Sequence, residues 1–306
     1  MQQENSELVS EIMRLKRERN ALIVAHNYQN DEVQDIADEV GDSFYLSRVC
    51  AKSDAEVIVF CGVKFMAESA KILSPQKTVL LPEITAGCPM ADSITAEDVR
   101  ALKAKHPGVP VVCYINTTAE VKAECDICCT SSNAVKIVRN MPEKEIIFLP
   151  DINLGTYVQK QVPEKNLILF NGGCITHNRF GAEEVDAARS KFPDAAIAVH
   201  PECKPEVCDK ADFVGSTSEI IDFCSKSDKK RFIIGTEMGV LHKLKNDNPD
   251  KKFYLMTPRL VCVNMKKTSL NSVYRALSEN RTVIEVNEDI RKRAVACLQR
   301  MLDFKF

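Results

Sequence analysis

The sequence lacks a strong net charge, a long apolar run and an apolar leader. Forty-one basic and 43 acidic side chains leave a net charge of −2 over 306 residues, so no basic field is available to attract nucleic acid or anionic membranes. No apolar run approaches the roughly 20 residues that a membrane-spanning helix needs. Residues 1–20 are charged throughout, so we expect no signal peptide there. The spacing of Leu8, Ile12 and Leu15 instead predicts an amphipathic opening helix.

Cysteine, in contrast, is abundant, with 13 residues. An odd count in a chain of this length argues against a disulfide framework, because such frameworks stabilise small secreted domains. We therefore expect a reduced, cytoplasmic protein in which most cysteines fill the core as small apolar side chains. The cysteines expected in the core are Cys50, Cys61, Cys113, Cys224 and Cys297.

Three other cysteines mark an internal repeat. Cys88, Cys174 and Cys262 are separated by 86 and 88 residues. A hydroxyl residue precedes them by 45, 43 and 45 residues, and a ring-bearing residue precedes each hydroxyl residue by 17. The hydroxyl residues are Ser43, Ser131 and Thr217, and the ring-bearing residues are His26, Tyr114 and His200. The same order in three places indicates that the chain is an internal triplication.

Each repeat contains three short apolar runs, which predict buried strands. The runs are residues 21–25, 56–60 and 78–81, then 109–115, 145–149 and 166–170, then 195–199, 231–235 and 252–256. Helical patterns alternate with them, which is typical of parallel sheets covered on both faces. Helices are expected after the key cysteines at 96–105, 182–191 and 269–279, and as a structural closure at 289–302.

The sequence therefore predicts an α/β protein. We expect three homologous three-layer α/β/α domains with small parallel sheets, in a pseudo-threefold arrangement around a central active site. The expected domains are residues 1–108 with the N-terminal helix, 109–194, and 195–306 with the C-terminal helix. Because ligands bind beyond the carboxyl ends of parallel strands, the loops after these strands are expected to share one cavity.

The three repeat cysteines point to a metal centre. Three thiolates from separate loops suit an iron–sulfur cluster or, with a fourth ligand, zinc. Structural zinc usually draws on CxxC pairs, and these cysteines are isolated, so we favour a [4Fe–4S] cluster with one open iron that can act as a Lewis acid. The alternative is three buried cysteines inherited from a duplicated ancestor. Glycine-rich surroundings such as 172–174 favour ligation.

The other repeated residues predict an anion site with acid–base groups. The three hydroxyl residues precede helical segments and are expected to cap them, and helix N-termini aimed at one cavity bind carboxylate or phosphate. Groups that can donate, accept or position protons are His26, Tyr28, Tyr114, His200 and Glu202. For a histidine at the end of a strand, a purely structural role is the alternative. His177 is a further candidate for the cavity.

The group Cys125-x-x-Cys128-Cys129 does not belong to the triplication. A CxxC can be a redox pair or half of a zinc site. Because the sequence has no second CxxC to complete a zinc site, we expect this group to be structural or incidental.

Seven stretches together resemble the quinolinate synthase family, which serves the bacterial and archaeal route to NAD. They are residues 23–29 (IVAHNYQ), 41–43 (GDS), 114–116 (YIN), 200–203 (HPEC), 213–218 (FVGSTS), 235–239 (GTEMG) and 264–267 (NMKK). The resemblance covers essentially the whole chain. It implies three α/β domains around an oxygen-sensitive [4Fe–4S] cluster on Cys88, Cys174 and Cys262. It also implies condensation of iminosuccinate with dihydroxyacetone phosphate to quinolinate, with loss of phosphate and two waters.

The resemblance also implies roles for individual residues. The residues placed in the substrate site are His26, Ser43, Tyr114, Asn116, Ser131, His200, Glu202 and Thr217. Glu202 and Tyr28 are the candidates for proton transfer, and His26 and His200 are the candidates for holding carboxylates or a carbonyl. The partners implied are small molecules, with a functional link to an aspartate-oxidising enzyme.

Two departures from the family pattern and two alternative functions remain. Val263 stands where the family commonly has proline, and the CxxC lies in the middle repeat, whereas some members carry one near the last ligand cysteine as a proposed redox switch. Thiol regulation is therefore unsupported. The alternatives are an aconitase-like [4Fe–4S] hydro-lyase and a non-catalytic, triplicated phosphosugar-binding protein with inert cysteines.

Overall fold

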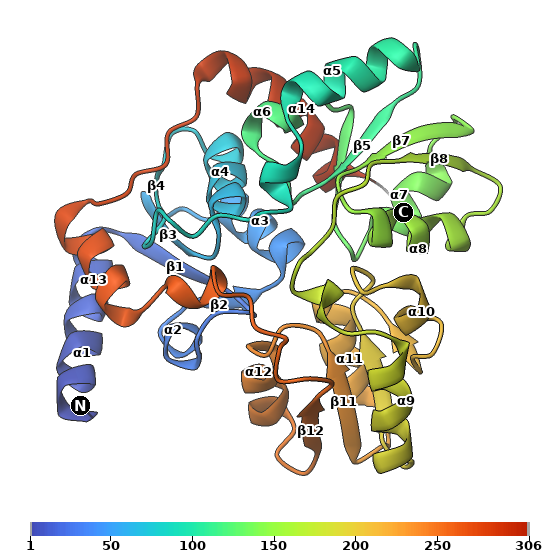
Figure 1. Cartoon of the computed structure of the whole chain (residues 1–306). Helices are drawn as coiled ribbons and strands as arrows, with labels where there is room; N and C mark the ends of the chain where they lie inside the picture. The colour runs from blue at the N-terminus through green and yellow to red at the C-terminus, as the bar shows by residue number, and fades with distance from the viewer. Residues whose placement is uncertain (1, 305–306) are drawn as a thin grey trace.

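The computed structural model describes residues 2–304 and contains three four-stranded parallel sheets, one in each repeat (Figure 1). The first sheet contains β1 (Ala21–His26), β2 (Glu39–Gly41), β3 (Val57–Cys61) and β4 (Thr78–Leu80). The second contains β5 (Val111–Tyr114), β6 (Ile127–Cys129), β7 (Glu145–Leu149) and β8 (Asn166–Leu169). The third contains β9 (Ala196–Val199), β10 (Phe213–Val214), β11 (Arg231–Gly235) and β12 (Lys252–Leu255).

The strand order is the same in all three sheets. It is β2-β1-β3-β4, β6-β5-β7-β8 and β10-β9-β11-β12, with parallel pairing throughout these ladders. This repetition confirms the predicted α/β class with three small parallel sheets. The prediction of three strands per repeat was wrong by one strand. The missed strands β2, β6 and β10 are two or three residues long, too short to stand out as apolar runs.

Helices connect the strands and cover the sheets. In the first repeat they are α1 (Gln2–Glu18), α2 (Asp31–Asp35), α3 (Ser43–Lys52), α4 (Lys64–Leu73) and α5 (Ala96–Lys105). In the second they are α6 (Ala119–Lys122), α7 (Ala134–Asn140), α8 (Ile152–Gln161) and α9 (Ala182–Lys191). The remainder are α10 (Pro205–Cys208), α11 (Thr217–Lys226), α12 (Val240–Asp247), α13 (Leu270–Glu279) and α14 (Glu288–Asp303). No described helix has the length and apolar character that a membrane span requires.

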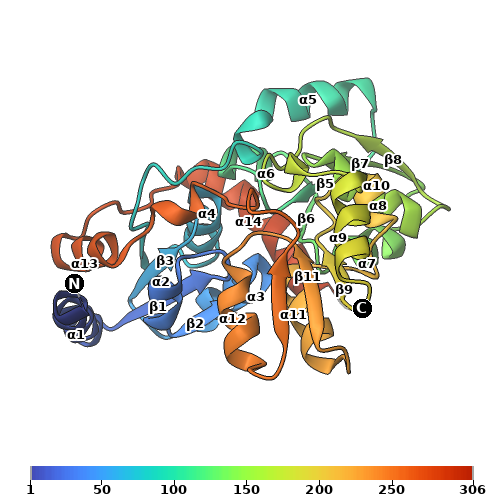
Figure 2. The ribbon, with the colours of Figure 1, turned by 60° about the horizontal axis from the view of Figure 1, so that its bottom comes forward.

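The repeats lie around a common centre. Figures 1 and 2 show the first sheet on one side, the second sheet above it on the other side, and the third sheet below. One large apolar core joins the first two repeats, and two smaller clusters lie on the two faces of the third sheet. The strand ends that point to the centre therefore belong to firmly packed sheets.

The segment after the third sheet returns to the first two repeats. The Ile284 N–H donates to Val79 O at 2.8 Å, beside the bridge between Leu80 and Val283. Helix α13 packs against α1, and α14 packs against α4, α6 and β6. Figure 1 shows α14 beside the helices of the second repeat, far along the chain from its own sheet. The segment thus ties the repeats together, as its predicted role of closure requires.

Candidate active site

One cavity lies where the three repeats meet. The carboxyl ends of β1, β5 and β9 bring His26, Tyr114 and His200 to its wall, as the geometry of parallel sheets requires. The triplication therefore places three equivalent strand ends at one site.

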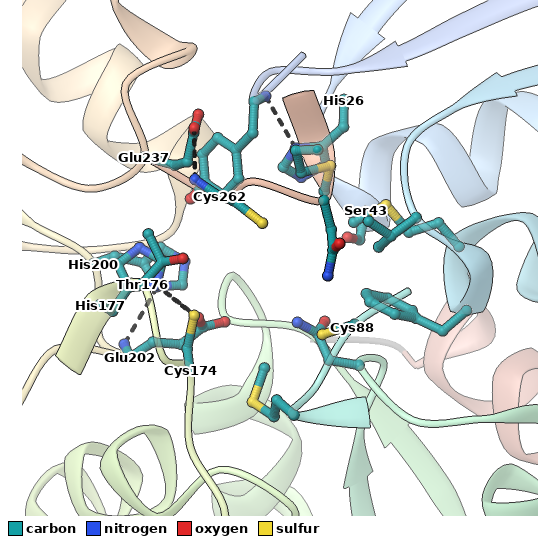
Figure 3. A pocket seen from close by; sticks show the side chains of 18 of the residues that line it. His26, Ser43, Cys88, Cys174, Thr176, His177, His200, Glu202, Glu237 and Cys262 are labelled. Atoms are coloured by element: carbon teal, nitrogen blue, oxygen red, sulfur yellow. Dashed lines mark hydrogen bonds and ion pairs between the residues drawn. The ribbon is translucent and has the colours of Figure 1, made fainter. Parts of the chain in front are cut away.

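The structure brings every predicted site residue to this cavity. The residues are His26, Tyr28, Ser43, Cys88, Tyr114, Asn116, Ser131, Cys174, His200, Glu202, Thr217 and Cys262. His177, the further candidate, lines it as well. Figure 3 shows side chains from all three repeats pointing into the same space. Their roles in binding and catalysis stay predictions.

The hydroxyl residues predicted to cap helices do not cap them. The observed caps are Asp42 of α3, Asn133 of α7 and Ser216 of α11. Ser43 and Thr217 follow their caps by one residue, and Ser131 precedes its cap by two. Asp42 and Ser216 accept a backbone N–H of their helix as strong caps do, whereas Asn133 occupies the cap position of α7 without such a bond. The hydroxyls of Ser43, Ser131 and Thr217 consequently remain on the cavity wall.

The histidines of the first and third repeats share one local geometry. The Tyr28 N–H donates to His26 Nδ1 at 3.1 Å, and the Glu202 N–H donates to His200 Nδ1 at 3.3 Å. Because Nδ1 accepts in both rings, the proton of each neutral ring is on Nε2. Burial lowers the pKa of both histidines to about 3. Both rings are therefore neutral hydrogen-bond donors at neutral pH.

Glu202 is a buried carboxylate at the centre of a hydrogen-bonded group. The Tyr114 O–H donates to Glu202 Oε1 at 2.5 Å, and His177 Nδ1 lies 2.8 Å from Glu202 Oε2. Burial alone would raise the pKa of Glu202, but the neighbouring histidines and the Tyr114 hydroxyl outweigh burial and hold this pKa below its usual range. Burial and Glu202 raise the pKa of Tyr114. The proton between the two groups therefore belongs to the phenol.

Tyr28 is a second protonated phenol in the cavity. Its hydroxyl lies 2.8 Å from Thr217 Oγ1 and 2.7 Å from Thr236 Oγ1. Burial, together with the charge of Glu202, raises the pKa of Tyr28 well above its ordinary value. The two threonine hydroxyls fix the direction of the phenol, so Tyr28 is a positioned proton donor.

The three repeat cysteines share a backbone motif. A short 3₁₀ helix begins three residues after each cysteine, and the N–H of its second residue donates to the cysteine carbonyl at 3.0–3.2 Å. These helices are Ala91–Ser93, His177–Arg179 and Met265–Lys267. Backbone N–H groups at the start of each helix lower the pKa of the cysteine thiol, but burial outweighs them.

The donor set fits a metal centre bound by thiolates. Burial raises the pKa of the free Cys88 thiol to about 12 and also raises the pKa of Cys174 and Cys262. A coordinated metal ion reverses this, because a coordinating thiol loses its proton. Figure 3 shows the three sulfur atoms facing the same space from three different loops. The residues present therefore fit a centre that needs three sulfur ligands.

Residues that the sequence analysis weighted lightly or missed complete the site. His177 Nδ1 lies 3.2 Å from Cys174 Sγ, and the ligand atoms of Cys174, His177 and Glu202 all lie within 4.8 Å of one another. The signal for His177 was its position three residues after Cys174, where the 3₁₀ helix begins. Thr236 and Glu237 were missed. Their signal was their place directly after β11, at the same edge of the sheet as His200.

A second group of sulfur atoms lies away from the cavity. Cys113 Sγ is 3.4 Å from Cys128 Sγ and 3.6 Å from Cys297 Sγ, and all three side chains are buried. They come from β5, β6 and α14 and do not line the described cavity. By distance alone these three thiols are close enough to hold a metal ion. Cys113 and Cys297 are buried in the core as expected, and Cys128 of the CxxC joins them there.

Comparisons with known proteins identify the family of this chain. The family model described as quinolinate synthetase A protein matches residues 10–303. A quinolinate synthase of Caldicellulosiruptor bescii is 63% identical over 296 residues, covering 97% of this chain and 98% of that protein. One from Alkaliphilus metalliredigens is 57% identical over 298 residues, covering 97% and 98%, and one from Geobacter metallireducens is 56% identical over 292 residues, covering 95% and 96%. The chain therefore belongs to the quinolinate synthase family.

Proposed function

We propose that the protein condenses iminosuccinate with dihydroxyacetone phosphate to quinolinate, with loss of phosphate and two waters. In this proposal Cys88, Cys174 and Cys262 hold a [4Fe–4S] cluster. One observation carries it: three cysteines from three repeats face one cavity, each at the same place before a 3₁₀ helix. The names of similar proteins support the same activity.

The cluster would supply an iron atom without a protein ligand, which acts as a Lewis acid on a substrate oxygen or nitrogen. The cavity offers three cysteine sulfurs for four irons, which is consistent with one open iron.

Several neutral donors in the cavity can bind anions. The two substrates bring two carboxylates and one phosphate into a cavity that already contains the carboxylate of Glu202. His26 and His200 present Nε2–H groups, and Ser43 and Thr217 present hydroxyls at the N-termini of α3 and α11. Helix N-termini carry partial positive charge, which favours carboxylate or phosphate. Asn116 and Ser131 are assigned to orienting the bound substrates.

Proton transfer is assigned to Glu202 and Tyr28. Glu202 is ionised and buried, so it can accept a proton from substrate carbon or nitrogen. Tyr28 keeps its proton at neutral pH and is held by two threonine hydroxyls, so it can protonate a departing hydroxyl group. The Tyr114 O–H donates to Glu202 and keeps the carboxylate in place.

The proposal is tested with protein purified and reconstituted without oxygen. We expect brown protein with about four irons per chain, and quinolinate formed only when both substrates are present. Turnover without dihydroxyacetone phosphate would favour the aconitase-like hydro-lyase. Colourless protein that binds the phosphosugar would favour the non-catalytic binding protein. Either result would overturn the proposal.

The same chemistry suggests a setting for the enzyme. Free thiols and an oxygen-sensitive cluster suit a reducing compartment such as the cytoplasm. Iminosuccinate is the imine formed when aspartate is oxidised, so we propose a functional link to an aspartate-oxidising enzyme.

A further inference from the structure

The three ligand loops are attached to their sheets by the same backbone bond. The strands concerned are β3, β7 and β11, the third strand of each repeat along the chain. Three residues after each strand, a backbone N–H donates at 2.9 Å to the carbonyl two residues before the cysteine. The pairs are Lys64 with Ala86, Ile152 with Gly172 and Met238 with Leu260. The loops that contain Cys88, Cys174 and Cys262 therefore share the same backbone attachment.

The residue just before each of these N–H donors differs between the repeats. The position is occupied by Val63, Asp151 and Glu237 in the three repeats. Asp151 Oδ2 accepts the Cys174 N–H at 3.1 Å, and Glu237 Oε1 accepts the Cys262 N–H at 3.0 Å. Two of the three ligand residues are thus held directly by a carboxylate.

Both carboxylates are anchored at their other oxygen. Asp151 Oδ1 accepts the Leu154 N–H at 2.7 Å, in the first turn of α8. Glu237 Oε2 accepts the Gly239 N–H at 2.7 Å, just before α12, and lies 3.2 Å from Lys266 Nζ. Asp151 is 1% exposed and Glu237 is 0% exposed. Each carboxylate is therefore a buried clamp between a helix start and a ligand backbone.

The first repeat has no such clamp. The apolar Val63 side chain cannot accept a hydrogen bond, and among the described residues no side-chain acceptor is found for the Cys88 N–H. The Cys88 loop is attached by the Lys64–Ala86 backbone bond and, three residues before the cysteine, by the Lys267 side chain, which donates to Thr85 O. The missing carboxylate is specific to this repeat, because Val63 is the N-cap residue of α4 just as Asp151 is the N-cap residue of α8.

Burying a carboxylate beside sulfur ligands costs free energy unless hydrogen bonds compensate. Removing a carboxylate from water is unfavourable, and its charge repels neighbouring thiolates. Here the cost is offset by two or more hydrogen bonds to each group, which order the ligand backbone before the metal arrives. Groups that orient metal ligands from behind commonly contribute 10–100-fold to metal affinity.

We propose that Asp151 and Glu237 are positioning residues that hold Cys174 and Cys262 in ligating geometry, and that Cys88 is the ligand that detaches first when the cluster is lost. This inference rests on the proposed cluster site. It assigns an order to three ligands that the triplication alone would make equivalent.

The first test measures iron release to a ferrous chelator without oxygen, using reconstituted wild-type protein and the variants Asp151→Asn and Glu237→Gln. An amide keeps the carboxylate shape but has one acceptor oxygen, so one backbone N–H loses its partner. We expect release at least about tenfold faster in both variants, and release within about twofold of wild type in the matched variant Val63→Ala. Wild-type rates in both amide variants would overturn the inference.

The second test needs no variant and therefore does not depend on variant folding. Wild-type protein is allowed to lose part of its cluster, is alkylated briefly and is analysed by peptide mass spectrometry. We expect label on Cys88 before Cys174 and Cys262. Equal labelling, or later labelling of Cys88, would overturn the inference. Wild-type protein that takes up no cluster would instead refute the proposed function, so the two failures are distinguishable.

Discussion

Two groups of three cysteines share the same side-chain chemistry but differ in their burial and in their surroundings. Cys88, Cys174 and Cys262 are partly exposed in loops, and a 3₁₀ helix begins three residues after each of them. The group formed by Cys113, Cys128 and Cys297 is fully enclosed, and its sulfurs contact one another among apolar side chains. The core sulfurs all lie within 4.8 Å of one another, whereas the cavity sulfurs come from three loops that line a shared space. In the proposed function the cluster lies at the cavity group, even though the core sulfurs are near neighbours.

The largest expected effect is a difference in iron content and activity between a cysteine variant of the cavity group and one of the core group. Cys174→Ala should lose its cluster iron, and activity should fall about a thousandfold or more, since a Lewis acid contributes several kcal/mol. Iron per chain and quinolinate formation are measured on protein reconstituted without oxygen. Cys297→Ala, the matched control in the core, should keep its full iron content. A Cys174→Ala protein with wild-type iron would remove the distinction between the groups.

The next prediction separates metal binding from proton transfer inside the cavity. Glu202→Gln should keep its iron but lower kcat by about 10²–10⁴-fold, the usual contribution of a general acid–base group. Iron analysis, the visible spectrum and kcat are measured on the same sample. Loss of iron in parallel with kcat would instead assign Glu202 to the metal.

A pH experiment sharpens the contrast between cavity and core. His26 and His200 have pKa values of about 3 when folded and near 6.5 when unfolded. Between these values the unfolded chain binds more protons, so their contribution to stability is full above pH 6.5 and is lost as pH falls toward 3. Each histidine can contribute a slope of up to about 1.4 kcal/mol per pH unit.

The measurement is denaturant unfolding of the metal-free protein between pH 6 and 4. The double variant His26→Gln with His200→Gln should show a shallower fall in stability than wild type. Cys297→Ala should keep the wild-type slope, because burial raises the pKa of Cys297 and the thiol is neutral throughout this range. Equal slopes in wild type and the histidine variant would contradict the assignment of neutral rings.

The smallest expected effect is in the core. Cys297→Ala removes one buried sulfur atom from the contact between α14 and β5, and should lower the free energy of unfolding by about 1 kcal/mol. The matched change Cys224→Ala, in the separate core of the third repeat, should cost a similar amount. A much larger loss at Cys297 alone would indicate that the core sulfur group is held by more than packing.

The sequence pattern predicted the residues of the cavity better than it predicted the strands and the helix caps. Repeat offsets alone placed His26, Tyr114 and His200 at one cavity, because equivalent strand ends in a triplicated fold must face the same way. Apolar runs revealed the longer strands, whereas β10, with two residues, has too little sequence to carry a pattern. The hydroxyl residues were misread as caps because each has a neighbour of equal capping strength.

Contacts between distant segments could not be read from the sequence. Cys113 and Cys297 are 184 residues apart, and nothing local to either predicts that α14 crosses the second sheet. Asp151 and Glu237 were detectable in principle, because they occupy equivalent repeat positions. Their meaning depends on hydrogen bonds to Cys174 and Cys262, which only three-dimensional geometry reveals.

The returning tail has a consequence for how the protein is made. Thr282 bonds to Leu81, 201 residues earlier, and α14 closes the core shared by the first two repeats. Domains tend to fold in order as the chain leaves the ribosome, so the first sheet gains its last partner only after residue 284 has been synthesised. If the proposed cluster is present, iron and sulfide would reach the pocket only after this tail has folded, and ribosome-bound chains that lack the tail should contain none.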